Sequence, residues 1–72
     1  MTLAAHILAD AATTVCAATA TAETIDTVAF VNVPTADVET VAKAMAATLH
    51  GAKHDGYGHV SWNGYSVWVM AA

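Results

Sequence analysis

The sequence contains no arginine, only two lysines and a single cysteine among its 72 residues. The two lysines, Lys43 and Lys53, are outnumbered by six acidic residues, and the formal net charge is −4. A nucleic-acid-binding surface needs cationic side chains that displace phosphate counterions, and an anionic membrane attracts the same groups. We therefore expect neither nucleic acid nor a membrane as a partner. The mild acidity instead favours encounter with a basic protein surface.

A lone cysteine, Cys16, leaves no internal disulfide, which is typical of a protein from the reducing cytoplasm. No window approaches the roughly 18 apolar residues of a membrane span. Residues 1–22 end in Ala-x-Ala patterns that resemble a signal-peptidase site. However, no positive charge follows Met1, and His6 and Asp10 interrupt the apolar stretch. We therefore predict a cytoplasmic protein without a secretion signal.

The short chain predicts one domain that spans residues 1–72. A chain of this size buries only about 60% of its unfolded surface, so its stability is marginal. Its 57% hydrophobic content includes 18 alanines, each of which buries little area. Stability must therefore come from good packing, self-association or a partner.

Two segments have the periodicity of amphipathic helices. Residues 2–21 place apolar side chains at helical spacing after Thr2, a suitable N-cap. Residues 35–50 also place apolar side chains at helical spacing, with Thr35 as the expected N-cap. Gly51 follows this segment, at the position where a residue in the left-handed conformation commonly ends a helix. The side of this second helix that should face the core carries Val38, Val41, Ala42, Met45, Ala46 and Leu49.

Residues 25–33 alternate as a strand that Pro34 ends, because proline has no N–H for the ladder. A glycine-rich loop is expected over residues 51–58. Asn63-Gly64 then lies between two alternating runs and predicts a two-residue type I′ hairpin turn. With that turn, the expected cross-strand pairs are Trp62 with Tyr65, Val60 with Val67, and His59 with Trp68.

The hairpin predicts the fold class. Its last strand is apolar on both faces, whereas residues 60–62 are apolar on one face only, so the last strand should be central. We predict an α+β fold with the order α-β-α-β-β. It has a three-stranded sheet with the first strand antiparallel to the last, and both helices lie mainly on one face. One helix on each face remains the alternative.

Candidate catalytic and metal-binding groups are sparse. His50, His54 and His59 lie within ten residues, with Asp55 between them, but no ligand-spacing motif accompanies them. His59 shares a strand face with Ser61, which lies about 7 Å away along the strand and is too far for a hydrogen bond. Because no nucleophile, base and orienting group come together in the sequence, we expect no enzyme, no metal and no cofactor.

The second face of the hairpin is the best indication of function. It carries Trp68 and Met70, flanked by His59, Ser61 and Ser66. If both helices cover the other face, these residues form an apolar patch with a polar rim, which is typical of a protein-binding surface. The loop that contains His54, Asp55 and Tyr57 is a second candidate. The alternative is that the first helix covers Trp68 and makes it part of the core.

In length, mild acidity and simplicity of fold, the chain is similar to the small inhibitors that phages and other mobile elements encode, such as anti-CRISPR proteins. The resemblance implies a non-catalytic module that docks on a host defence nuclease or surveillance complex and blocks it. A homodimeric structural or assembly protein is the alternative. A metal-binding protein of the loop with His50, His54 and His59 is the second alternative.

Overall fold

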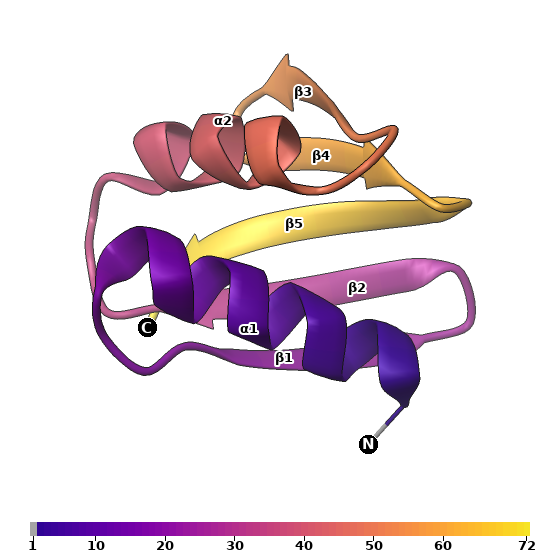
Figure 1. Ribbon diagram of the computed structural model, residues 1–72, viewed down its shortest axis with the longest axis horizontal. Coiled ribbons are helices and arrows are strands. Elements are labelled where there is room, and N and C mark those ends of the chain that lie inside the picture. The colour runs from indigo at the N-terminus through magenta and orange to yellow at the C-terminus, as the bar shows by residue number, and fades with distance from the viewer. Residues whose placement is uncertain (1) are drawn as a thin grey trace.

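Two helices and five strands make up this protein, and the computed structural model describes residues 2–72. In chain order the elements are α1 (Leu3–Cys16), β1 (Thr21–Ile25), β2 (Val28–Val33), α2 (Val38–Thr48), β3 (Lys53–Gly56), β4 (His59–Trp62) and β5 (Tyr65–Ala71). The strands form one mixed sheet in the order β1-β2-β5-β4-β3 (Figure 1). Only β2 and β5 are parallel. The α+β class is confirmed, while the three-stranded sheet and its α-β-α-β-β order are wrong.

Both helices lie on the same face of the sheet (Figure 1). α1 packs against β1 and β2, and α2 packs against β3, β4 and β5. The core lies between these layers, and its largest fully buried side chains are Leu8, Met45, Val31, Val33, Val60 and Val67. One helix on each face is therefore excluded. Within residues 2–72, neither helix is long and apolar enough to cross a membrane.

The first helix is shorter than its sequence pattern predicts. Thr2 caps it as expected, because its hydroxyl oxygen accepts the N–H of Ala5 at 3.2 Å. The helix ends at Cys16, and Ala17 takes a left-handed conformation with φ 54°. The hydroxyl of Thr13 then accepts the N–H of Ala20 at 2.9 Å and holds the returning chain. The threonines at this end are mediocre helix formers, because their branched side chains lose rotamers, so pairing with β2 prevails over the helix preference of the alanines.

The predicted strand 25–33 is interrupted by a turn, and β1 and β2 form a hairpin around it. Asp26 adopts φ 53° and, with Thr27, forms a tight turn that pairs Ile25 with Val28. Aspartate tolerates this left-handed region better than most residues. β1 is thereby an additional edge strand, and only residues 28–33 keep the predicted alternation between the two faces.

The second helix starts later than predicted. Asp37, rather than Thr35, is its N-cap, since a carboxylate oxygen of Asp37 accepts the N–H of Thr40 at 3.3 Å. The hydroxyl of Thr35 instead accepts the N–H of Asp37 and shapes the preceding turn. Gly51 has the expected positive φ of 77°.

The C-terminal hairpin is confirmed. Asn63 and Gly64 have φ values of 49° and 81°, as a type I′ turn requires. All three predicted pairs are present, and β5 is central in the sheet.

The predicted antiparallel arrangement of the first and last strands is wrong, because β2 runs parallel to β5. The cause is β3, which lies in the segment expected to be a loop and pairs antiparallel to β4. This additional strand adds one reversal of the chain and so inverts the direction of β5 relative to β2.

Candidate functional site

The face of the sheet opposite the helices is not covered by any element of residues 2–72 (Figure 1). Trp68 is 40% exposed there and Met70 is 39% exposed, so the first helix does not cover Trp68. We call this surface the open face. The strands contribute to it Thr21, Glu23, Ile25, Val28, Phe30, Asn32, Lys53, Asp55, His59, Ser61, Ser66, Trp68 and Met70.

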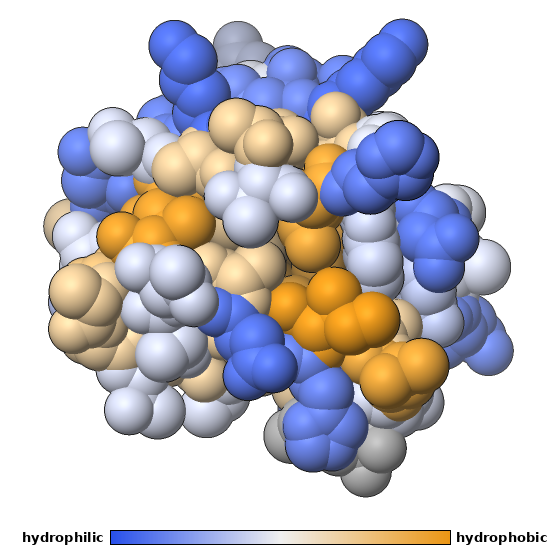
Figure 2. All heavy atoms as spheres, in the orientation of Figure 1, coloured by the Kyte–Doolittle hydropathy of each residue, from blue (hydrophilic) through white to orange (hydrophobic). Residues whose placement is uncertain are grey.

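One half of the open face is apolar. Phe30 on β2 lies beside Trp68 on β5, and Asn32 lies beside Met70. We call the apolar members the apolar stripe, which consists of Ile25, Val28, Phe30, Trp68 and Met70. On the helix side, by contrast, Figure 2 shows hydrophobic atoms interspersed with hydrophilic ones.

The other half of the open face is a hydrogen-bonded group that we call the polar array: Asp55, His59, Ser61 and Ser66. The Nδ1 atom of His59 is 2.9 Å from Oδ2 of Asp55. Its Nε2 atom is 2.6 Å from Oγ of Ser66. The hydroxyl of Ser61 donates to the same carboxylate oxygen of Asp55 at 3.0 Å.

The charge of Asp55 determines the direction of these bonds. The hydrogen bond from Ser61, followed by that from His59, lowers the pKa of the Asp55 carboxyl below its ordinary value of 3.8. An ionised carboxylate can only accept hydrogen bonds, so Nδ1 of His59 carries a proton. In neutral His59, Nε2 is then an acceptor and receives the hydroxyl hydrogen of Ser66.

His59 also connects the two halves of the open face. Its ring centroid lies 4.4 Å from that of Trp68, with the planes tilted by 52°. The backbone N–H of Ser66 donates to the carbonyl of Thr27 at 2.8 Å, which fixes the position of the serine. The array is therefore held both by the sheet and by an aromatic neighbour.

The other predicted residues lie elsewhere. His54 is on the helix side, where its Nε2 atom approaches Oε2 of Glu39 at 3.2 Å without the direction that a hydrogen bond requires. Tyr57 is 93% exposed in the β3–β4 turn, and His50 is exposed after α2. Because His54 and His59 lie on opposite faces of the sheet, the histidine cluster does not form. Across residues 2–72, no group of three or more His, Cys, Asp or Glu is placed to hold a metal ion.

Sequence reasoning missed the pairing of His59 with Ser66. The predicted register already contained it, because Trp68 opposite His59 places Ser66 on the diagonal, within reach of a histidine side chain. Phe30 was also missed as a member of the candidate surface. Its alternation with buried Ala29 and Val31 is the signal that could have placed it there.

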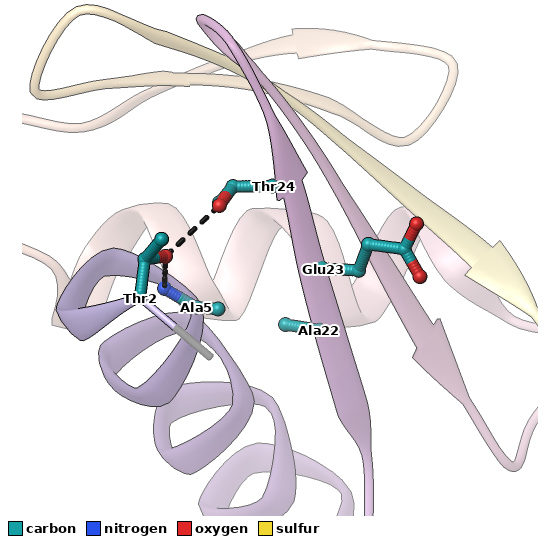
Figure 3. A pocket seen from close by; sticks show the side chains of 5 residues that line it. All are labelled: Thr2, Ala5, Ala22, Glu23 and Thr24. Atoms are coloured by element: carbon teal, nitrogen blue, oxygen red, sulfur yellow. Dashed lines mark hydrogen bonds between the residues drawn. The ribbon is translucent and has the colours of Figure 1, made fainter.

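Two shallow hollows border the sheet. One, of about 550 Å³, lies at the start of α1, where the hydroxyls of Thr2 and Thr24 bond to each other at 2.9 Å. Figure 3 shows Ala22 and Thr24 directed toward the helix, whereas Glu23 points away from it. The second hollow, of about 400 Å³, lies beside the β4–β5 turn, and its lining includes Lys53, Ser61, Asn63 and Ser66.

Comparison with protein-family models, with curated proteins and with solved structures finds no match to this chain.

The hydrogen bond from Ser61 should be measurable through the titration of Asp55. A lowered native pKa means that Asp55 contributes stability above its ordinary pKa of 3.8, and that this contribution is lost as the pH falls through the native pKa. We expect carbon NMR of the Asp55 carboxyl to show a midpoint below 3.8. Ser61→Ala should raise that midpoint, and an unchanged midpoint would contradict the bond.

Proposed function

We propose that the protein binds another protein through its open face, with the apolar stripe at the centre of the contact. The supporting observation is the exposure of Trp68 and Met70, at 40% and 39%, in the central strand of the sheet. Tryptophan and methionine are enriched at the centres of protein interfaces. Polar side chains of the array lie beside them and supply part of a polar rim.

The charges favour a basic partner. The open face carries the carboxylates of Glu23 and Asp55 near its two sides, and its basic side chains are Lys53 and His59. A partner with an apolar centre and a basic rim would match both the stripe and the carboxylates. A second copy of this chain would bring together two molecules of net charge −4, which opposes self-association.

The mode of action that we propose is occlusion. A small domain with a flat docking face can cover the working surface of a larger protein without chemistry of its own. The similarity to phage-encoded inhibitors directs the search to host defence nucleases and surveillance complexes, whose nucleic-acid-binding surfaces are basic. His54 lies outside this proposed face, and Tyr57 borders it at the β3–β4 turn.

The test compares Trp68→Ala with Leu3→Ala. Leu3 is exposed on α1, so its substitution removes apolar surface from the helix side. Partners are captured with the wild-type protein from host lysate, and each is then measured as a purified protein. A genuine partner should bind Trp68→Ala at least about 30-fold more weakly, as removal of a hot-spot residue costs about 2 kcal/mol or more. Leu3→Ala should bind normally.

Two results would contradict the proposal. Partner affinity that Trp68→Ala leaves unchanged would remove the stripe from the contact. A molecular mass that doubles with concentration, and that Trp68→Ala returns to the monomer, would assign the open face to a second copy. The melting temperature of Trp68→Ala must stay close to that of the wild type, because a large decrease would show that Trp68 is part of the core.

A further inference from the structure

We propose that Ser66 is an activated nucleophile, with His59 as its general base and Asp55 as the residue that positions the base. The site would accept the acyl group of small activated esters that reach the open face from solvent. This inference does not rest on the proposed docking function. The apolar stripe is the centre of that contact, whereas the polar array is only part of its rim.

The hydrogen-bonding order supports this role. A serine becomes a useful nucleophile when a base takes its proton and a third group orients that base. Here Oγ of Ser66 is 2.6 Å from Nε2 of His59, and Nδ1 of the same ring is 2.9 Å from Asp55. Both distances fall in the range for a nucleophile–base and a base–orienting-group contact.

Burial and packing hold the base in place. The side chain of His59 is 19% exposed and lies against the ring of Trp68. Ser61 supplies Asp55 with a second hydrogen bond, which favours the ionised carboxylate. The imidazole is therefore oriented with its unprotonated Nε2 atom toward Oγ of Ser66, as removal of the serine proton requires.

The neighbouring hollow offers room for a small acyl group. It is about 400 Å³ in volume and is lined by Ser66 together with Lys53 and Asn63. The ammonium of Lys53 and the amide of Asn63 are N–H donors of the kind that stabilise a developing oxyanion. The hollow is shallow and open, so the substrates should be small esters with good leaving groups.

The reaction with p-nitrophenyl acetate would proceed in two stages. Oγ of Ser66 attacks the carbonyl carbon while its proton passes to Nε2 of His59, and the bond to the aryl oxygen then breaks to release p-nitrophenol with that proton. Water next attacks the acetyl group and gives a proton to His59. The bond to Oγ breaks, Ser66 regains the proton, and acetic acid leaves and loses its own proton to solvent.

The experiment uses an alkyl fluorophosphonate, which traps the nucleophile because Oγ forms a bond to phosphorus and fluoride leaves. We expect the label on Ser66 and not on Ser61, its cross-strand neighbour and the only other serine of the chain. Tandem mass spectrometry of the labelled peptide distinguishes the two. The wild-type protein unfolded in urea should label at least about 100-fold more slowly, the lower end of the gain from general-base catalysis.

Substitutions test each role. Ser66→Ala should abolish labelling and p-nitrophenyl acetate hydrolysis at this site, and His59→Gln should slow both at least about 100-fold. Asp55→Asn should also slow them, whereas Asp10→Asn makes the same change on exposed α1 and should not. Circular dichroism must show that every variant is folded. Labelling that is absent, that falls on another residue, or that persists in His59→Gln would overturn the proposal.

The positioning role of Asp55 has a separate readout. Nitrogen NMR should place the His59 proton on Nδ1 in the wild-type protein, opposite the carboxylate. In Asp55→Asn an amide N–H can donate to Nδ1, and the proton should move to Nε2, which can then no longer accept from Ser66. The same tautomer in both proteins would show that Asp55 does not orient the base.

Discussion

Leu8→Ala is expected to lower the free energy of unfolding by about 2–5 kcal/mol, the range for emptying a buried leucine site. Leu8 is fully buried in the layer between the helices and the sheet. A domain of this length has a total stability of only about 4–11 kcal/mol, at 0.05–0.15 kcal/mol per residue. The substitution therefore removes a large share of it. Urea unfolding followed by circular dichroism measures the loss.

Leu3 provides the matched control on the same helix. It is 75% exposed, so Leu3→Ala makes the same chemical change without opening a cavity. We expect its effect to stay within about 0.5 kcal/mol, as for most surface substitutions. If the two variants lost equal stability, Leu8 would not lie in the core as described.

Gly58→Ala is expected to destabilise the protein by at least about 2 kcal/mol, because it adds a steric clash to a left-handed backbone that alone costs roughly 1–2 kcal/mol. Gly58 has φ 71°, and an added Cβ would lie 2.8 Å from the backbone oxygen of Val69. That oxygen cannot move away easily, since the N–H of Val69 donates to the carbonyl of Gly58 at 2.8 Å. The N–H of Gly58 is also bound, to the carboxylate of Glu39 on α2.

Gly51→Ala separates the two contributions. Gly51 has a similar φ of 77°, but beyond its two chain neighbours no other residue has an atom within 4 Å of an added Cβ. Its alanine variant should lose only the backbone term of roughly 1–2 kcal/mol. Thermal unfolding of both variants compares them directly. Equal melting temperatures would mean that the contact with Val69 has no energetic consequence.

The C-terminal hairpin shows how far local pattern can predict this fold. Asn63 and Gly64 specify the turn because few residue pairs tolerate positive φ at both positions. The turn fixes the register, and the register assigns Trp68 to the face away from Val67 and Val69. That placement of Trp68 was predicted from residue order alone.

β1 and β3 could not be predicted in the same way. Residues 21–25 follow a helical stretch of alanine and threonine, and residues 53–56 lie in a segment rich in glycine. Each is a short strand at an edge of the sheet. It is extended because it pairs with β2 or β4, and not because its own residues have a high strand propensity. The same limitation concealed the place of Asp55 in the polar array, because Asp55 reaches His59 only once β3 has formed.

The sequence by itself determined the α+β class, the type I′ turn, the central position of β5 and the two unequal faces of its hairpin. These follow from backbone sterics and from the alternation of side chains along a strand. Only the tertiary structure decided the direction of β5 relative to β2, the side on which α1 packs and the meeting of Asp55 with His59. These depend on the formation of β3 and on packing between elements distant in sequence, whose energies no local pattern records.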